Sequence, residues 1–388
     1  MKILSIETSC DETAVSIVEA TGSLAEPRFQ VLGNALYSQI DLHKDYGGVF
    51  PMLAKREHAK NLPPLLVHAM TEASILNPGT PPTEESWEKV RHIVSREDGL
   101  YEGLRSALEK IQKPDIDIIA VTSGPGLEPA LWVGISCAEA LGTLWNIPVI
   151  PANHMEGHIA SILIENSDQR KVTFPALALL ISGGHTELVE ISDWGQYQVI
   201  GQTRDDAVGE AFDKAARMLG LPYPGGPQIS RLAAEARESS LPHVAKLPRP
   251  MIHSDDYDFS FSGLKTAVLY YIREKGQLSN EDKQDIAREF EDAAVDVLLS
   301  KTRKALEATG AQTLIIAGGV IANKKIREAF SSLEKELSGL SVKTPTTTLA
   351  TDNALMIACA AYIHTSLYPE LLKKSPEKII AHGNMRLG

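Results

Sequence analysis

The sequence predicts an α/β protein built from two related halves, and three observations support this. Strand patterns alternate with helical patterns along the chain. The length of 388 residues exceeds that of one typical domain of about 100–200 residues. A strand, a polar turn and a returning strand occur near the N-terminus and again after residue 175. This recurrence favours two structurally related lobes.

The first half is expected to begin with two strands, over residues 3–7 and 14–19, joined by a turn of small and polar residues at 8–13. Helical spacing of apolar residues predicts a helix over 58–73, which Pro63 and Pro64 would start or break. The elements expected next are a buried strand over 116–122, a buried helix over 130–144 and a short strand over 148–151.

The second half is expected to repeat the strand pair over residues 176–181 and 187–191. The remaining elements expected there are amphipathic helices over 206–219 and 282–306 and a strand over 314–317. A late apolar helix is predicted over 352–363. Residues 76–114 are rich in Pro, Glu and Ser before turning helical, so we interpret them as a surface insertion.

Composition excludes several classes of protein. A net charge of −12 argues against a domain that coats nucleic acid through bulk electrostatics, although a local basic groove is compatible with it. The three cysteines, Cys10, Cys137 and Cys359, form no CxxC pair and imply no disulfide framework. With no secretory pattern and no apolar run of about 18 residues, we expect a cytoplasmic protein without a membrane span.

Two histidines are the strongest candidates for metal ligands. His154 and His158 stand four residues apart after a predicted strand, so a helix there would point both imidazoles the same way. Asp352, at the predicted start of the late helix, is the best candidate for a third ligand. A capping and a core histidine, with Asp352 as a helix cap only, remain the alternative interpretation.

Glycine-rich turns suggest an anion site. Ser182, Gly183 and Gly184 lie between two predicted strands, and Gly318 and Gly319 follow another strand. Glycines let backbone N–H groups approach a phosphate, although a plain hairpin and a tight connection explain them equally well. The sequence has no dinucleotide-binding GxGxxG after the first strand and no GxSxG nucleophile motif.

These motifs, in their order along the chain, resemble the tRNA threonylcarbamoyladenosine synthase family, whose bacterial member is TsaD and which was once described as a glycoprotease family. The resemblance rests on residues 6–13, 154–158, 180–186, 259–266, 318–319 and 351–353. It covers nearly the whole chain except 76–114. It implies a two-lobed actin-like ATPase fold (the sugar kinase, Hsp70 and actin class, ASKHA) with a nucleotide cleft between the lobes. The expected lobes are 1–150 with 345–388, and 151–344.

The resemblance also implies an activity: transfer of a threonylcarbamoyl group from threonylcarbamoyl-AMP to N6 of the adenosine beside the anticodon, in tRNAs that read ANN codons. It implies that His154, His158 and Asp352 bind one divalent metal, iron(II) first and zinc second, and that Asp11 and Glu12 form the catalytic turn. The residues expected to contact the adenylate, or another adenine nucleotide, are Leu180, Ile181, Ser182, Gly183, Gly184, Asp213, Gly226 and Asn323. The expected partners are tRNA, a shorter inactive TsaB-like paralogue and a small TsaE-like ATPase.

Three other functions stay open at this point. A metal-dependent glycoprotein endopeptidase would use the two histidines with Glu156 as the base, although their spacing is not that of the zincin helix. A sugar kinase or general ATPase of the same fold would not need the paired histidines. A non-catalytic scaffold would not need to retain the histidines and Asp352. The candidate contacts to tRNA are Arg204, Lys265, Lys324, Lys325 and Arg327, for which ordinary surface charge is the alternative.

Overall fold

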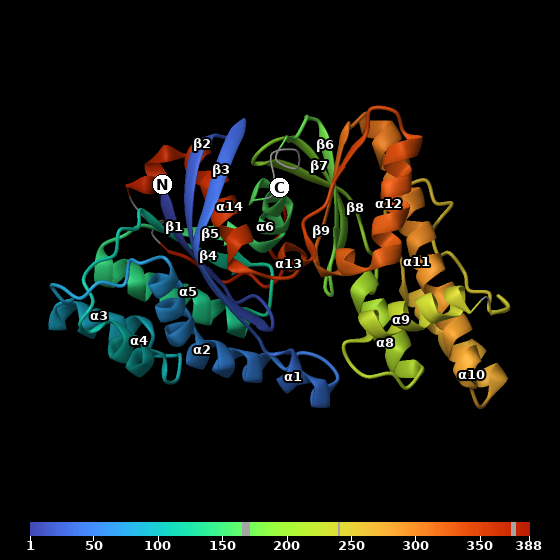
Figure 1. Cartoon of the computed structure of the whole chain (residues 1–388), viewed down its shortest axis with the longest axis horizontal. Helices are drawn as coiled ribbons and strands as arrows, with labels where there is room; N and C mark the ends of the chain where they lie inside the picture. The colour runs from blue at the N-terminus through green and yellow to red at the C-terminus, as the bar shows by residue number, and fades with distance from the viewer. Residues whose placement is uncertain (165–170, 240, 374–377) are drawn as a thin grey trace. The chain divides into compact units, whose positions relative to one another are not determined.

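The computed structural model describes residues 1–164, 171–239, 241–373 and 378–388. The chain forms two compact units. Unit 1 comprises residues 1–171 and 352–387, and unit 2 comprises residues 172–351 with Gly388. Each unit contains a five-stranded sheet with helices packed beside it (Figure 1). In the described part of the chain, no helix combines the length and the apolar character that crossing a membrane requires.

The sheet of unit 1 has the strand order β3-β2-β1-β4-β5. Strands β1 (Lys2–Glu7), β2 (Glu12–Ser23) and β3 (Glu26–Ser38) pair antiparallel. Strands β4 (Ile118–Gly124) and β5 (Val149–Asn153) continue the sheet in parallel from β1. The sequence did not indicate β3, because its side chains are mostly exposed and lack a clean alternation.

The sheet of unit 2 repeats this arrangement. Strands β6 (Ala176–Ile181), β7 (Thr186–Asp193) and β8 (Gln196–Gln202) pair antiparallel, and β9 (Thr313–Ala317) and β10 (Ser341–Lys343) add in parallel. Its strand order is β8-β7-β6-β9-β10. When the five strands of each sheet are numbered along the chain, both sheets have the order third, second, first, fourth and fifth. The expectation of two related halves from the repeated strand pair is therefore confirmed.

The helices of unit 1 pack against its sheet and against one another. Helix α5 is apolar around its circumference and is buried, as the continuous apolar run predicts. Helix α2 begins before the predicted helix and keeps Pro63 and Pro64 inside it. The helical segments of this unit are α1 (Ile40–His43), η1 (Lys44–Tyr46), α2 (Pro51–Glu72), α3 (Glu84–Ile93), α4 (Leu100–Leu108), α5 (Glu128–Trp145), α6 (His154–Ala160), η2 (Ser161–Ile164), α14 (Ala354–Leu367) and η4 (Pro369–Leu372).

The segment 76–114 is part of the core of unit 1, which corrects its interpretation as a surface insertion. Helix α3 packs against α5, and α4 packs against α2. Their apolar side chains join the same buried cluster as those of β1 and β4. The segment is amphipathic, so its exposed polar face dominates the composition and hides the buried face. The most deeply buried residues of the segment are Trp87, Val90, Leu100, Leu104 and Leu108.

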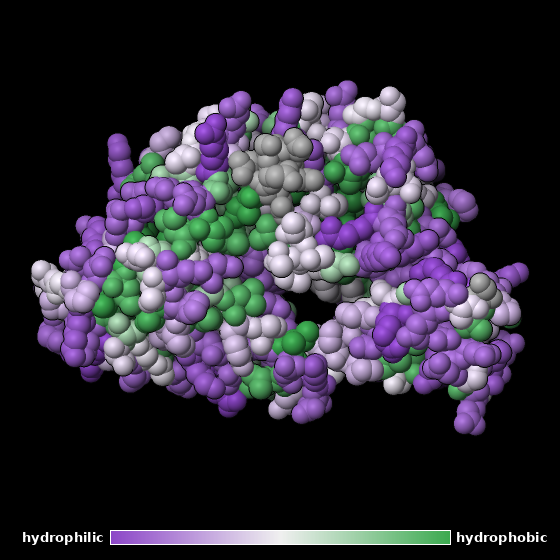
Figure 2. All heavy atoms as spheres, viewed as in Figure 1, coloured by the Kyte–Doolittle hydropathy of each residue, from purple (hydrophilic) through white to green (hydrophobic). Residues whose placement is uncertain are grey.

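Unit 2 has its own core, in which the aromatic side chains of Phe212, Phe290 and Phe330 are almost completely buried. The long helix α11 begins with a capping box between Ser279 and Asp282 and ends at Gly310 in the left-handed conformation. The helical segments of this unit are α8 (Val208–Met218), α9 (Gly225–Glu238), α10 (Ser262–Lys275), α11 (Asn280–Thr309), η3 (Gly319–Ala322), α12 (Lys324–Glu336) and α13 (Thr347–Ala350). The face drawn in Figure 2 is largely hydrophilic, with hydrophobic patches showing over unit 1.

The division between the units differs from the lobes expected at 150 and 345. Residues 151–171 belong to unit 1, and residues 345–351 belong to unit 2. The reason is that β5 completes the first sheet as far as Asn153, and α6, which follows directly, packs against α14. All three proposed metal ligands consequently lie within unit 1, whereas the expected boundary separated the histidines from Asp352.

Candidate metal centre and pocket

Helix α6 presents the two histidines on one face. The side-chain oxygen of Asn153 accepts hydrogen bonds from the backbone N–H groups of Met155 (2.8 Å) and Glu156 (3.2 Å), which starts the helix at His154. His158 follows one turn later, and the two ring centroids are 4.7 Å apart with planes at 85°. The helical spacing expected from the sequence is therefore confirmed.

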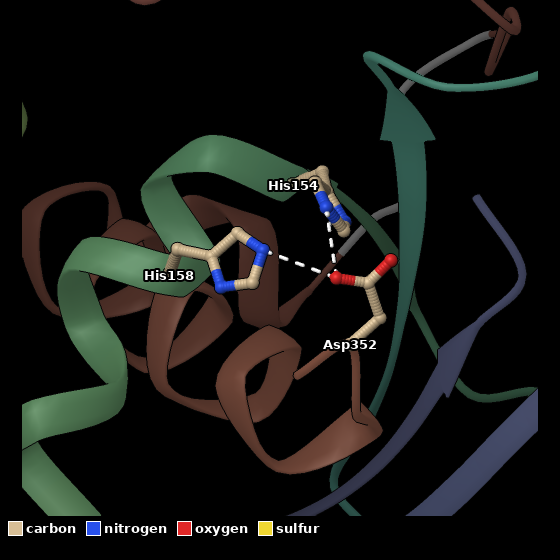
Figure 3. A group of neighbouring side chains, drawn as sticks. All are labelled: His154, His158 and Asp352. Atoms are coloured by element: carbon tan, nitrogen blue, oxygen red, sulfur yellow. Dashed lines mark ion pairs between the residues drawn. The ribbon is translucent and has the colours of Figure 1, made fainter. Parts of the chain in front are cut away.

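Asp352 does not cap helix α14. That cap is Asn353, whose side chain accepts a hydrogen bond from the N–H of Met356 at 3.1 Å. The Asp352 carboxylate instead faces the histidines. Its Oδ1 lies 3.4 Å from His154 Nε2 and 3.2 Å from His158 Nε2. Figure 3 shows both imidazoles directed at this one oxygen.

The arrangement fits a single cation. The ligand atoms of His154, His158 and Asp352 lie within 4.8 Å of one another. Ligand atoms on an ion with bonds of about 2.0–2.2 Å lie roughly 3.0–3.5 Å apart, so the two contacts to Asp352 have the required length. His158 is fully buried, and neither of its ring nitrogens has a hydrogen-bond partner among the described residues. An unsatisfied buried polar group costs about 1–3 kcal/mol, and a bound metal removes that cost.

The other nitrogen of His154 is held from behind. Its Nδ1 lies 3.1 Å from Glu7 Oε2 and 3.2 Å from Ser9 Oγ. Glu7 is the fully buried last residue of β1, and its Oε2 also accepts a hydrogen bond from Thr122 Oγ1 at 2.6 Å. A carboxylate on Nδ1 fixes the orientation of a ligating imidazole and leaves Nε2 for the metal. Sequence reasoning missed Glu7, although an acidic residue ending an apolar strand was a visible signal.

The electrostatics of the cluster are dominated by opposite charges. Burial alone would raise the pKa of Asp352, but attraction to His154 and the close contacts of its carboxylate with the Nε2 atoms of both histidines hold that pKa far below its usual range. Burial alone would lower the pKa of His154, but Asp352 and Glu7 outweigh it and raise that pKa well above its usual value. The cluster therefore attracts positive charge, which a divalent ion supplies in place of a proton.

The expected catalytic residues lie in the turn that joins β1 to β2. Asp11 is in the turn, and Glu12 is the first residue of β2. Glu12 Oε1 accepts a hydrogen bond from Ser38 Oγ at 3.3 Å. Burial, followed by the nearby negative charges of Asp352 and Asp11, raises the pKa of Glu12 well above its usual value. A carboxyl group with a raised pKa is suited to accepting or donating a proton near neutral pH.

Unit 2 contains a pocket of about 450 Å³. Four of the eight residues expected to contact an adenylate line it: Gly183, Asp213, Gly226 and Asn323. Of its other lining residues, the sequence also suggested Gly319, as part of an anion-binding turn, and Lys324, as a contact to tRNA. The remaining lining residues are Gly209, Phe212, Pro224, Pro227, Ser230, Arg231, Val320 and Ala322. The lining residues come from four chain segments, 183, 209–213, 224–231 and 319–324, and the fold brings these distant segments together.

The side chains of Asp213 and Asn323 differ in the hydrogen bonds that they make. Asp213 Oδ1 accepts a hydrogen bond from the N–H of Gly225 at 2.7 Å; burial raises the pKa of Asp213, and bonds from Gly225 and Gly226 oppose this. The Asn323 oxygen caps α12 by accepting from Ile326 N at 3.0 Å. Its amide nitrogen donates to Ser230 Oγ (2.7 Å) and Glu291 Oε1 (2.8 Å). Asn323 therefore shapes the pocket with polar atoms that are already engaged.

The other four expected contacts are not among the pocket's lining residues. Leu180 and Ile181 are fully buried in β6. Ser182 Oγ accepts hydrogen bonds from the N–H groups of Gly184 (3.3 Å) and His185 (3.0 Å), which closes the turn between β6 and β7. Gly209 lies against this turn, since a Cβ there would be 2.6 Å from the Ser182 carbonyl oxygen. These residues set the position of Gly183, which does line the pocket.

All five of the expected basic contacts to tRNA already have polar partners. Arg204 contacts Asp256 at 2.6 Å and Asp258 at 2.9 Å, and Lys265 contacts Asp206 at 2.8 Å. Lys324 lies 3.6 Å from Glu328, Lys325 lies 3.9 Å from Asp292, and Arg327 donates to Thr344 Oγ1 and to the Pro345 carbonyl oxygen. Lys324 has a side chain that is 89% exposed and stands at the rim of the pocket.

Comparison with known proteins identifies the family. The model of the family described as tRNA N6-adenosine threonylcarbamoyltransferase (TsaD) matches residues 30–78 and 98–359. A tRNA N6-adenosine threonylcarbamoyltransferase of Burkholderia cenocepacia is 42% identical over 376 residues, which are 95% of this chain and 94% of that protein. The chain belongs to this family. A member from Paraburkholderia xenovorans is 43% identical over 372 residues, with the same coverage of both chains.

As a tRNA N6-adenosine threonylcarbamoyltransferase family member, the chain is an enzyme with the actin-like α/β fold expected from the sequence. The crystal structure of full-length HypF in its phosphate- and nucleotide-bound form matches with a TM-score of 0.52 and 12% identity, over 94% of this chain and 46% of HypF. That likeness bears on the fold alone. Between its two matched ranges, the family model leaves out only residues 79–97. This gap is shorter than the segment 76–114 that the resemblance was expected to leave out.

Proposed function

We propose that this transferase forms N6-threonylcarbamoyladenosine at the adenosine beside the anticodon of tRNAs that read ANN codons, with threonylcarbamoyl-AMP as the donor. Family membership supports the transferase activity and tRNA as the substrate. The observation that carries the proposal is the convergence of His154, His158 and Asp352 in unit 1, with a fully buried His158 that lacks a hydrogen-bond partner among the described residues.

One divalent ion held by these three residues is part of the proposal. Two imidazoles and a carboxylate suit iron(II) and zinc, and we propose iron(II) first. Glu7 would orient His154 through Nδ1, as carboxylates orient ligating histidines in general. When bound, the ion supplies positive charge that stabilises the negative charge of the donor and of the leaving phosphate.

The pocket of unit 2 is proposed to hold the AMP part of the donor. Its volume suits a nucleotide-sized ligand. The Asp213 carboxylate is fixed by the Gly225 N–H and would accept hydrogen bonds from ribose hydroxyls. Helices α9 and α12 begin at residues that line or adjoin this pocket, and the N-terminus of a helix favours a phosphate. Gly183 would let its backbone approach the ligand without a side chain in the way.

The transfer step requires a nucleophile, a leaving group and a proton acceptor. The exocyclic nitrogen of the adenosine attacks the carbamoyl carbon, and a C–N bond forms. The bond from that carbon to the phosphate oxygen breaks, and AMP leaves with the electron pair. The attacking nitrogen loses one proton, which Asp11 or Glu12 is proposed to accept. The raised pKa of Glu12 makes it the stronger candidate for this acceptor.

The two competing activities lack support from the site. A peptidase would need Glu156 as a base beside the histidines, but Glu156 is 2% exposed and its Oε2 lies 2.7 Å from His364 Nε2. Glu156 is thus committed to α14. A kinase or general ATPase has no use for the convergent histidines. The presence of all three ligands also opposes a scaffold role. A TsaB-like paralogue and a TsaE-like ATPase are proposed as partners on the strength of the resemblance alone.

The test is reconstitution. The chain, the two proposed partner proteins, threonylcarbamoyl-AMP and unmodified tRNA are incubated, and the tRNA is digested to nucleosides for mass spectrometry. N6-threonylcarbamoyladenosine is expected in amounts that depend on the donor. A parallel reaction with an unrelated tRNA that lacks the target adenosine is the control. No modified nucleoside with the complete set of components would show the proposal to be wrong.

A further inference from the structure

A row of buried polar side chains lies beside the turn that carries Asp11 and Glu12. Thr13, Gln39, His43 and His58 are all fully buried, and they come from β2, from the residue between β3 and α1, from α1 and from α2. Neither histidine is among the three proposed metal ligands, and neither lines the pocket of unit 2. Two buried histidines in one polar cluster need specific partners, because an unpaired polar group in the core is costly.

The end of the row nearest the start of α2 fixes the protonation of His43. The backbone N–H of Phe50 can only donate, and it lies 3.3 Å from His43 Nδ1. Nδ1 therefore accepts, and a neutral ring carries its proton on Nε2. His43 Nε2 lies 3.3 Å from Gln39 Oε1, which can only accept. The Gln39 amide nitrogen consequently points onward, 3.4 Å from Thr13 Oγ1 and 3.3 Å from His58 Nδ1.

The other end of the row fixes His58 in the same sense. The Cys10 carbonyl oxygen can only accept, and it lies 3.0 Å from His58 Nε2. Nε2 therefore donates, and the Nδ1 of the neutral ring accepts from Thr13 Oγ1 at 2.8 Å. Burial lowers the pKa of His58 to about 4, so the ring is neutral at physiological pH. Every bond in the row then runs in one direction, from the Phe50 N–H to the Cys10 carbonyl.

The turn is also attached to this row through its backbone. Gln39 N donates to the Asp11 carbonyl oxygen at 2.9 Å, and Glu12 pairs with Ser38 in the β2–β3 register. Hydrogen bonds therefore hold the turn at two carbonyl groups: His58 binds that of Cys10, and Gln39 binds that of Asp11. A chain of hydrogen bonds with one consistent direction is cooperative, so its members hold one another in a single tautomer and rotamer.

We infer that His58, supported by Gln39 and His43, is a positioning residue that sets the Asp11–Glu12 turn through the Cys10 carbonyl. The inference rests on the proposed catalytic role of that turn. It assigns a function to a histidine that touches neither the proposed metal ligands nor the proposed adenylate pocket. A displacement of catalytic groups of about 1 Å from such a remote change lowers turnover by roughly 100-fold.

Two substitutions at one position separate positioning from packing. In His58→Gln the side-chain amide reaches the former Nε2 position and can still donate to the Cys10 carbonyl. In His58→Asn the amide reaches only the former Nδ1 position, and the Cys10 carbonyl loses its donor. Both variants lose the ring and a similar packing contact, so a purely structural role predicts similar behaviour from the two.

The readouts are kcat, KM for threonylcarbamoyl-AMP, metal content and amide hydrogen exchange of residues 9–12, measured on the reconstituted enzyme. For His58→Asn we expect kcat to fall by about 10-fold to 100-fold, with KM and metal content within about twofold of the unmodified chain. The exchange of the turn amides should rise. His58→Gln should recover most of kcat and of the protection.

Equal kcat in both variants and the unmodified chain would overturn the inference, as would equal losses that follow a shared loss of folded protein. The hydrogen-exchange measurement tests the positioning role of His58 even if the proposed transferase function is wrong. If the unmodified chain transfers nothing, the proposed function fails, and unchanged protection of the turn in His58→Asn would then still refute the positioning role. Raised exchange confined to His58→Asn would support it.

Discussion

The turn between β1 and β2 and the turn between β6 and β7 occupy equivalent places in two sheets of the same order, yet their surroundings differ. The first turn is enclosed: Ser9 is buried, Cys10, Asp11 and Glu12 are only partly exposed, and buried His58 holds the Cys10 carbonyl. The second turn is open, since a Cβ on Gly183 or Gly184 would meet nothing within 4 Å. One fold element thus provides a rigid acidic turn in unit 1 and an accessible backbone turn in unit 2.

This difference matches the chemistry proposed for each. Acid–base work needs carboxyl groups held in one place with perturbed pKa values, and enclosure supplies both. Binding a phosphate or a nucleotide needs backbone N–H groups that a ligand can reach, and small residues supply that access. The comparison can be tested by removing a feature from one region and asking whether only its own property is lost.

The largest effect is expected from the metal ligands beside the first turn. His158→Ala removes a fully buried ligand and should lower bound metal and transfer activity by at least ~100-fold, because two remaining ligands hold a divalent ion poorly. Metal analysis of the purified protein and the nucleoside assay measure the two losses. His92→Ala, at an exposed position of α3, is the control and should change neither. Full metal content in His158→Ala would contradict the assignment.

A smaller effect is expected from Glu7, which holds the far nitrogen of His154. Glu7→Gln keeps the shape but removes the charge, and metal affinity should fall by roughly 10-fold to 100-fold. The measurement is a competition titration with a chelator of known affinity. Adenylate binding to unit 2 should be unchanged in the same protein. An unaltered metal affinity would mean that Glu7 does not orient the ligand.

These two predictions differ in what the sequence discloses. His154 and His158 follow from spacing on one short helix, and the repeated strand pair discloses the duplicated sheets, because both are local patterns. Glu7 is a ligand support only through a contact 147 residues away in sequence, and no local period encodes that contact. The same holds for Asn353, which takes the cap that the alternative interpretation gave to Asp352 and leaves that carboxylate directed at the histidines.

The missed elements have a similar explanation. Strand β8 has partly exposed side chains and no clean alternation, so its sequence resembles a loop. Helix α3 presents a charged face, and only the packing of Trp87 and Val90 against α5 shows that it belongs to the core. The pocket was half anticipated: the resemblance named Gly183, Asp213, Gly226 and Asn323, but Phe212 and Arg231 reach it only through the packing of α8 and α9.

The free energy of unfolding should depend on pH through His58, which lies beside the first turn. The folded pKa of His58 is about 4, below its ordinary value of 6.5, because burial disfavours the charged ring. Between these values the unfolded chain binds the proton and the folded chain does not, so the stability contribution is present above pH 6.5 and is lost as pH falls towards 4. At pH 5 the loss is about 2 kcal/mol.

The measurement for this third prediction is the free energy of unfolding by denaturant between pH 7.5 and pH 5, for the unmodified chain and for His58→Gln. The variant has no titrating ring, so its stability should fall less over this range by about 2 kcal/mol. Parallel slopes for the two proteins would mean that His58 is not held neutral by burial.

The smallest effect is expected at the open turn. Gly183→Ala should leave stability nearly unchanged, because the new methyl group meets no atom within 4 Å, but it places that methyl group at the wall of the pocket. Adenylate affinity, measured by calorimetry, should fall roughly tenfold, since a ligand's approach to the backbone is obstructed. Gly318→Ala is the contrasting control. Gly318 has φ +96°, and its Cβ would lie 2.5 Å from the Ile181 carbonyl oxygen, so stability should fall by about 1–3 kcal/mol. If Gly183→Ala were the destabilised variant and bound adenylate normally, the second turn would be a structural hairpin, and the contrast between the two turns would not reflect ligand access.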